Sequence, residues 1–325
     1  MKIVCPDGTA EIRELLTPES EAKLEALGSF VWYNDRADTS EGYLQRVKDA
    51  DGVILNWDMP AEVIMSCSKL QIISFLGADP RKFVDLSIAS RMGIAVTNTP
   101  HYADQEVATH AMALMLCCAK RITRFNSQLH QGVYEKGDFT SELWGKTLGV
   151  VGLGGIGTEV ARLAQAFGMR VLCWTQHPIP ERARKHGVEF ATLEELFQQS
   201  DIVTLHVTHT PETEKIITRN LLESMKRGAI FVNTARAELV DNLALAELLK
   251  KGLLSAAGLD VHDQEPVRPD DPFLSIENAI LTPHVAANTA KAQGNILKIA
   301  VDNVEAFFSG RSRNVITPEV LPQRT

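Results

Sequence analysis

The chain has 325 residues, 45% of them hydrophobic and 23% charged, a composition typical of globular rather than disordered or fibrous proteins. A chain of this length exceeds the size at which one hydrophobic core usually stops growing, so we expect two domains. The formal net charge of −8 argues against a nucleic-acid partner, because a polyanion would be repelled.

The sequence also argues against a membrane or an exported protein. The longest apolar stretch, residues 111–119, is far shorter than the roughly 20 residues of a spanning helix. The first apolar run, KIVC, is interrupted at once by Pro6, unlike a secretory signal. Five cysteines without a CxxC pair form neither a disulfide framework nor a zinc site. We therefore expect a protein of the reducing cytoplasm.

Over the first hundred residues, short apolar segments alternate with segments of helical period. The expected strands are KIVC (2–5), SFVWY (29–33), DGVILN (51–56), QIISFL (71–76) and GIAVTN (93–98), and the expected helices cover 19–27, 42–48 and 61–67. Thr17 and Pro18 form a typical helix start. This alternation is typical of βα units, which build a parallel sheet with helices on both faces.

A long apolar helix is expected over about residues 104–124, and the alternation then resumes. The expected strands here are TLGVVG (147–152), RVLCWT (170–175), DIVTLH (201–206), AIFVNT (229–234) and AAGLDV (256–261), with helices over 156–167 and 241–251. A capping box at Thr192–Glu195 starts a further helix. The segment 289–308 has helical period, and we expect it to pack on the first lobe because a lone helix cannot bury its apolar face.

These elements predict an α/β protein with two Rossmann-like or flavodoxin-like parallel-sheet domains and a cleft between them. The boundaries that follow are residues 1–100 plus 288–325 for the first domain and residues 101–287 for the second.

A glycine-rich turn joins the first strand of the second domain to the helix after it. Its residues are Gly152, Gly154, Gly155, Ile156 and Gly157. In a dinucleotide fold such glycines allow a tight turn, a close approach to the pyrophosphate and close packing of helix on strand. A GxGxxG motif alone also fits a turn without a ligand, but the strand before it and the helix after it favour a dinucleotide site.

The acidic residue expected about 20 positions later, which would bind the adenosine ribose, is missing. Thr175 stands at that position, so the repulsion that excludes a 2′-phosphate is absent. Both NAD and NADP are therefore candidate cofactors. Arg182 and Arg184 are candidates for a phosphate contact, although both also fit a solvated helix face.

Three later segments lie at or near the carboxyl ends of strands, where open α/β sheets bind ligands. They contain Arg236, Glu265 and His284. Arginine can bind a carboxylate through two hydrogen bonds, histidine can transfer a proton to a carbonyl oxygen, and glutamate can orient that histidine. Each residue alone also has a purely structural explanation, as a surface ion pair, a loop carboxylate or a hydrogen-bonded histidine.

Four segments in this order resemble the signature blocks of the D-isomer-specific 2-hydroxyacid dehydrogenases: Gly152–Gly157, NTARAELVD, GLDVHDQEP and TPHVAANT. The resemblance implies a hydride transfer between NAD(P) and a small 2-hydroxy or 2-oxo acid. It implies that Arg236 binds the substrate carboxylate, that His284 is the general acid/base and that Glu265 is its partner.

The resemblance also assigns the other contacts. The implied substrate residues from the first, substrate-binding domain are the backbone amides of Leu76, Gly77 and Ala78. On the second, dinucleotide-binding domain, the implied cofactor contacts beyond the glycine turn and Thr175 are Val207, Thr234, Ala235 and Asp260. A homodimer built on the long helix after residue 100 is implied as well.

Some alternatives stay open. A dinucleotide-sensing, corepressor-like binding protein and a phosphite-type dehydrogenase would share much of this pattern. His262 either lines the cofactor cleft or is a loop histidine that faces solvent. We expect no metal site: His206 and His209 have no carboxylate or cysteine cluster beside them, and Cys117 and Cys118 fit a helix core.

Overall fold

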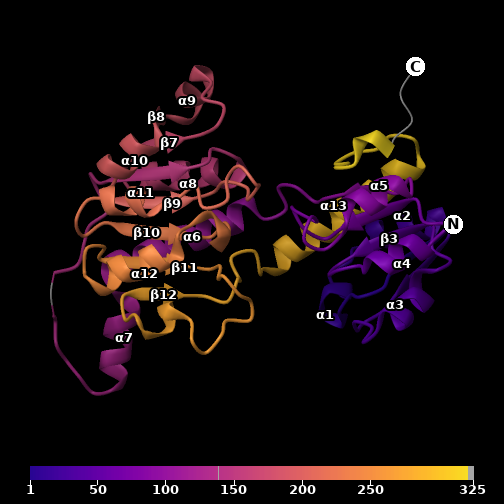
Figure 1. Cartoon of the computed structure of the whole chain (residues 1–325), viewed down its shortest axis with the longest axis horizontal. Helices are drawn as coiled ribbons and strands as arrows, with labels where there is room; N and C mark the ends of the chain where they lie inside the picture. Colours follow the sequence, from indigo (N-terminus) through magenta and orange to yellow (C-terminus); the bar gives the residue numbers. More distant parts are fainter. Residues whose placement is uncertain (138, 321–325) are drawn as a thin grey trace. The chain divides into compact units, whose positions relative to one another are not determined.

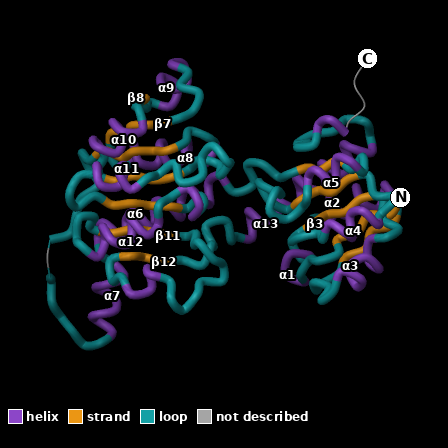
Figure 2. The backbone as a smooth tube through the Cα atoms, in the orientation of Figure 1, coloured by secondary structure: helices purple, strands orange, loops and turns teal. Residues whose placement is uncertain are grey.

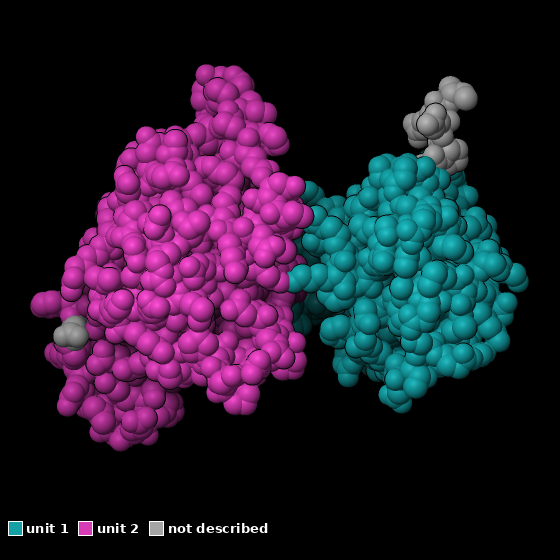
Figure 3. Space-filling view, in the orientation of Figure 1, with its two compact units in different colours: residues 1–103, 288–325 teal, residues 104–287 magenta. Residues whose placement is uncertain are grey.

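The computed structural model describes residues 1–137 and 139–320, and it divides into two compact units (Figure 3). Unit 1 comprises Met1–Ala103 and Asn288–Thr325, of which residues 321–325 lie outside the described part; unit 2 comprises Asp104–Ala287. Each unit is built on a parallel sheet, which confirms the expectation of two parallel-sheet α/β domains.

Unit 1 has a five-stranded parallel sheet in the order β2-β1-β3-β4-β5. Figure 1 labels its central strand, β3. Its strands are β1 (Lys2–Cys5), β2 (Ser29–Trp32), β3 (Gly52–Leu55), β4 (Ile72–Phe75) and β5 (Ala95–Thr97). Its helices are α1 (Ala10–Arg13), α2 (Pro18–Leu27), α3 (Ser40–Val47), α4 (Ala61–Ser66), α5 (Leu86–Arg91) and α13 (Ala290–Phe308), with a 3₁₀ turn over Pro318–Val320. One buried cluster joins the sheet to α3, α4 and α5, and another joins it to α2 and α13.

The last long helix, α13, belongs to unit 1 although it follows unit 2 in the chain. Its apolar face covers the sheet, and the Ser74 hydroxyl donates to the Ala300 carbonyl over 3.1 Å. The buried Asn303 side chain donates to the Asn98 carbonyl at 2.9 Å, so polar as well as apolar contacts hold the helix on β4 and β5.

Unit 2 has a seven-stranded parallel sheet in the order β12-β11-β10-β9-β6-β7-β8. Figure 2 labels β7 and β8 toward one edge of this sheet and β11 and β12 toward the other. Its strands are β6 (Thr147–Val151), β7 (Arg170–Trp174), β8 (Glu189–Phe190), β9 (Ile202–Leu205), β10 (Ile230–Asn233), β11 (Ala256–Leu259) and β12 (Ala279–Leu281). Its helices are α6 (Asp104–Lys120), α7 (Ile122–His130), α8 (Gly155–Ala166), α9 (Pro180–His186), α10 (Leu193–Gln199), α11 (Arg219–Ser224) and α12 (Asn242–Lys250). Two 3₁₀ turns, η1 (Ala237–Leu239) and η2 (Pro272–Ser275), complete it.

The inner strands of unit 2 are largely buried on both faces, as continuous apolar runs predict, whereas the edge strands β8 and β12 are partly exposed. In β6, Leu148 and Val150 pack in the cluster under α6 and α8, whereas Val151 packs in the cluster under α10, α11 and α12. Helices on both faces leave the two ends of the sheet for the loops, so any ligand must bind at a strand end.

Two expected helix starts are confirmed in detail. The Thr17 hydroxyl accepts the Ser20 amide at the start of α2, with Pro18 in the first turn. Thr192 and Glu195 form the predicted capping box at the start of α10. Hydrogen bonds of the capping side chains therefore fix the residues at which α2 and α10 begin.

The single helix expected over residues 104–124 is wrong in one respect. The structure ends α6 at Lys120, and Arg121 adopts a left-handed conformation with φ of 52° before α7 begins. Non-glycine residues adopt this conformation infrequently, so helical periodicity gave no sign of the break. Among the described helices, none is long and apolar enough to cross a membrane.

Candidate active site

The three predicted catalytic residues follow neighbouring strands of unit 2. Arg236 comes after β10, Glu265 after β11 and His284 after β12, and these strands pair in parallel in that order. The loops are joined where they leave the sheet: the Asp260 amide donates to the Asn233 carbonyl at 3.0 Å, and the Thr282 amide donates to the Leu259 carbonyl at 3.0 Å. Parallel strands thus bring the three residues to one edge of the sheet.

Glu265 and His284 are in direct contact. Nδ1 of His284 lies 2.7 Å from Oε2 of Glu265, and since a carboxylate only accepts, Nδ1 carries the proton of this bond. Burial raises the pKa of Glu265, but the hydrogen bond and charge of His284 and the His262 amide outweigh it, so the pKa lies below its ordinary value. Glu265 is therefore charged at neutral pH, and Nε2 of His284 is the nitrogen left for a ligand.

The backbone around His284 is unusual. His284 has φ of 53°, a left-handed conformation, and its amide donates to the Thr282 carbonyl at 3.0 Å. The next two amides, of Val285 and Ala286, both donate to the carboxylate of Asp260 at 2.9 Å. Asp260 is fully buried and also accepts the Thr282 hydroxyl at 2.6 Å. Its carboxylate thus stabilises the loop on both sides of His284.

Arg236 stands at the start of η1 with its guanidinium folded back on its own loop, where one terminal nitrogen donates to the Ala235 carbonyl at 2.6 Å. The Asn233 side chain donates to the Arg236 carbonyl at 2.8 Å and accepts the Ala235 amide at 2.9 Å. Asn233 therefore sets the conformation of the loop that carries Arg236, a role that the sequence did not reveal.

The glycine turn is built around close backbone approaches. A Cβ atom on Gly157 would lie 1.9 Å from the Gly152 carbonyl oxygen, and one on Gly152, whose φ is 103°, would lie 2.6 Å from the His206 carbonyl oxygen. A Cβ on Gly154, in contrast, would meet no protein atom within 4 Å. Gly152 and Gly157 are thus required by the fold, whereas Gly154 borders open space beside the start of α8.

The same region fits a bound dinucleotide in two further ways. No side chain caps α8, so the first-turn amides of Gly155, Ile156 and Gly157 can bind a pyrophosphate. The Thr234 hydroxyl and Nδ1 of His206 are buried without a hydrogen-bond partner among the described residues. Buried polar atoms rarely lack partners, so we expect a ligand or water to bind them.

The remaining predicted contacts lie just after β7 and β9 in unit 2 and just after β4 in unit 1. Thr175 and Val207 follow β7 and β9 and are half-buried. In unit 1, the Leu76 amide donates to the Leu55 carbonyl at 2.8 Å, whereas the amides of Gly77 and Ala78 have no acceptor among the described residues. Of the predicted substrate amides, those of Gly77 and Ala78 stay available for an anion.

Comparison with known proteins shows the family of this chain. Residues 112–286, more than half of the chain, match the family model described as the NAD-binding domain of the D-isomer specific 2-hydroxyacid dehydrogenases. The chain belongs to this family. It is 36% identical to a glyoxylate reductase of Korarchaeum cryptofilum over 90% of this chain and 91% of that protein. It is 35% identical to a hydroxypyruvate reductase of Blautia hydrogenotrophica over 90% and 93% of the two chains.

Two solved structures have a similar fold over nearly all of this chain. A D-2-hydroxyisocaproate dehydrogenase has a TM-score of 0.85 at 25% identity, covering 98% of this chain and 100% of that one. An acyclic imino acid reductase solved with NADPH and D-Arg has a TM-score of 0.85 at 28% identity, covering 97% of this chain and 100% of that one.

The D-3-phosphoglycerate dehydrogenase of Archaeoglobus fulgidus is 39% identical over 81% of this chain, but the match covers only 50% of that protein.

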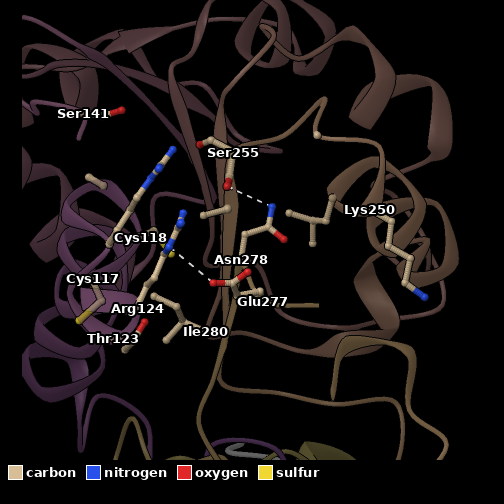
Figure 4. Close-up of a pocket in the computed structure, with 15 residues that line it drawn as sticks. Cys117, Cys118, Thr123, Arg124, Ser141, Lys250, Ser255, Glu277, Asn278 and Ile280 are labelled. Carbon is tan, nitrogen blue, oxygen red and sulfur yellow. Dashed lines mark hydrogen bonds and ion pairs between the residues drawn. The ribbon is translucent and has the colours of Figure 1, made fainter. Parts of the chain in front are cut away.

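A cavity of about 360 Å³ in unit 2 is separate from these residues (Figure 4). It lies at the amino ends of β11 and β12, where Asn278 donates to the Ser255 carbonyl at 3.1 Å and Arg124 lies 3.5 Å from Glu277. None of the predicted catalytic or cofactor residues lines it. Among the described residues, no group of three His, Cys, Asp or Glu side chains is placed to hold a metal ion.

The turn geometry makes a prediction about two of its glycines. Gly154→Ala should leave the melting temperature nearly unchanged, because the new methyl group meets no protein atom, yet it should weaken dinucleotide binding about tenfold or more by obstructing the pyrophosphate. Fluorescence titration with NADH and NADPH measures the binding. Gly157→Ala is the contrasting variant, since its methyl group would collide with the Gly152 carbonyl and destabilise the fold. Unchanged dinucleotide affinity in Gly154→Ala would contradict the assignment of the turn.

Proposed function

We propose that this chain reduces a small 2-oxo acid to the corresponding D-2-hydroxy acid with a nicotinamide dinucleotide. The observation that carries this proposal is the 2.7 Å contact of His284 with Glu265. The Glu265 loop follows β11, which pairs with the strand before Arg236, and all three residues lie on the same unit as the glycine turn. The relatives that match over about 90% of both chains are named glyoxylate reductase and hydroxypyruvate reductase, which favours a short, unbranched substrate.

The bound dinucleotide supplies the hydride in the reduction. The protein supplies the proton: Nε2 of His284 donates to the carbonyl oxygen while Nδ1 remains bonded to Glu265. The carboxylate of Glu265 stabilises the protonated imidazole before the transfer and holds the ring in one orientation. In the oxidative direction the neutral ring accepts the hydroxyl proton at the same nitrogen.

Arg236 is assigned to the substrate carboxylate. One of its terminal nitrogens is bonded to the Ala235 carbonyl, so the rest of the guanidinium group can form the paired hydrogen bonds that a carboxylate accepts. Its charge also stabilises the negative charge that gathers on the neighbouring carbonyl oxygen during reduction.

A panel of 2-oxo acids tests this function. Glyoxylate, hydroxypyruvate, pyruvate and longer aliphatic and aromatic 2-oxo acids are each offered with NADH and with NADPH, and the loss of reduced cofactor is followed by absorbance. We expect the shortest acids to turn over best. Dinucleotide binding without turnover of any acid would contradict the proposal and would fit a dinucleotide-sensing binding protein, whereas oxidation of phosphite alone would show the phosphite-type reaction.

Two variants test the proton transfer. His284→Asn should lower kcat by about 10²–10⁴-fold while dinucleotide binding survives, because only the acid/base is lost.

Glu265→Gln should move the pH optimum of reduction to lower pH, because the protonated imidazole loses the charge that stabilises it. Steady-state rates across a pH series measure both effects. A Glu265→Gln profile that overlays that of the parent would remove Glu265 from the mechanism.

We further propose that the chain accepts NADPH. No carboxylate stands at Thr175, and Arg182 reaches from α9 to the carbonyl of Leu153 in the glycine turn, which leaves a positive charge close to the end of β7. A structural neighbour was solved with NADPH. A ribose 2′-phosphate would therefore meet a cation and a hydroxyl rather than an acid.

Thr175→Asp should shift preference from NADPH toward NADH by about tenfold or more, since the new charge would repel the 2′-phosphate. Thr175→Asn is the matched control, because it has nearly the shape of aspartate without its charge. The measurement is kcat/KM with each cofactor. A parent protein that already rejects NADPH by several orders of magnitude would overturn the proposal.

Finally, we propose that two copies of the chain form a homodimer. The resemblance implied an interface on the long helix after residue 100, but the exposed apolar residues lie on α7 and in the segment after it, so we propose the interface there. No residue of α7 is buried, and Leu129 is 60% exposed. Tyr134 and Phe139 follow with exposures of 84% and 100%. Large apolar side chains gathered in this way are uncommon on monomers and typical of protein interfaces.

The double variant Leu129→Asp, Tyr134→Asp should convert the dimer to a monomer of 35.8 kDa in sedimentation velocity, because charges would be buried without partners. Leu243→Asp is the control, since Leu243 is 69% exposed on α12 and should leave the assembly intact. A parent protein that already sediments as a monomer would refute the interface.

A further inference from the structure

The Glu265–His284 contact is short, although both side chains are partly open to solvent. The Glu265 side chain is 39% exposed and the His284 side chain 44%. An exposed pair of this kind stabilises its own geometry only weakly, because water competes and both side chains lose freedom. The 2.7 Å distance therefore depends on how firmly the two loops, residues 260–266 and 282–286, are held to each other.

One side of the contact is held by buried groups. The Asp260 carboxylate accepts the Thr282 hydroxyl and the amides of Val285 and Ala286. Because the Thr282 hydroxyl proton is used in that bond, Nε2 of His110 on α6, 3.0 Å from the same oxygen, is the donor to it. These bonds fix the backbone on either side of His284, but they do not reach Glu265.

His262 contacts Glu265 directly and also contacts the loop that carries His284. Its amide donates to Oε1 of Glu265 at 3.1 Å, while Oε2 of the same carboxylate binds His284. Its ring nitrogen Nε2 lies 3.0 Å from the Thr282 carbonyl oxygen, two residues before His284. A carbonyl oxygen only accepts hydrogen bonds, so Nε2 of His262 carries a proton.

We infer that His262 is a positioning residue that ties the Glu265 loop to the His284 loop. Its amide orients the carboxylate, and its ring holds the backbone that carries the imidazole. Loss of the ring hydrogen bond would free one loop to move relative to the other. A shift of about 1 Å at such a contact is enough to cost about 10²-fold in rate. The effect on rate rests on the proposed function, whereas the geometry of the pair does not.

Two substitutions separate the hydrogen bond from the bulk of the ring. His262→Phe keeps an aromatic ring of similar size and removes the donor. His262→Gln keeps an N–H donor at a similar reach and serves as the conservative variant. Both retain the backbone amide that binds Glu265, so any difference between them reports on the bond to the Thr282 carbonyl.

The first measurement needs no substrate. Long-range ¹H–¹⁵N spectra of the full-length protein report the tautomer of each histidine ring, and the His284→Asn variant assigns the His284 signals. In the parent and in His262→Gln we expect His284 to be held in the tautomer with the proton on Nδ1. In His262→Phe we expect ring nitrogen shifts that report a mixture of both tautomers. Unchanged His284 shifts in a folded His262→Phe protein would overturn the inference.

The second measurement is turnover with the best 2-oxo acid of the panel. His262→Phe should lower kcat by about 10- to 100-fold, with KM and the dinucleotide Kd changed less than about threefold, and His262→Gln should recover most of the loss. A parent without activity would refute the proposed function and leave the spectra to decide the role of His262. Should His262→Phe fail to fold, the Gln variant compared with His262→Leu provides the same contrast. Equal activity in all variants would show that His262 positions nothing.

Discussion

The candidate site depends on the parallel register of β10, β11 and β12. Each strand ends in a loop that carries one of the proposed catalytic residues, and the amide of Asp260 and the amide of Thr282 bind the carbonyls of the preceding strands at 3.0 Å. Three side chains separated by up to 48 positions in the sequence thereby share one edge of the sheet. A change of register in any of these strands would separate them, since side chains would turn to the opposite face.

Asp260 shows how the site maintains an uncommon backbone conformation. A fully buried carboxylate is costly unless hydrogen bonds replace its water, and here three donors come from the loop of His284. These hydrogen bonds replace the water that the carboxylate would bind in solvent. They also stabilise the backbone on both sides of His284, which offsets the cost of its left-handed conformation. The resemblance implied that Asp260 contacts the cofactor, whereas its carboxylate here accepts hydrogen bonds from Thr282, Val285 and Ala286.

The fold class and most helices and strands could be predicted from the sequence, because the spacing of apolar residues and the capping residues are local signals. The glycine turn could be recognised since its neighbours are a strand and a helix. The break at Arg121 could not, because left-handed arginine has no characteristic pattern. The sequence leaves His262 either in the cofactor cleft or facing solvent, and it gives no sign of the hydrogen bond from its ring to the Thr282 carbonyl. A bond between loops that are distant in sequence, such as that of His262, leaves no periodic pattern to recognise. The bonds of Asn233 are local, but no sequence motif indicates that its side chain binds the Arg236 carbonyl.

The glycine turn has a consequence for how cofactor choice can evolve. Backbone atoms packed against Gly152 and Gly157 leave no room for any side chain, so these two positions tolerate no substitution. Just after β7, in contrast, Thr175 is half-buried and Gln176 is exposed. Affinity for the shared diphosphate and discrimination between its two ribose forms are thus encoded in different atoms, and natural variation can alter the second while the first is inherited unchanged.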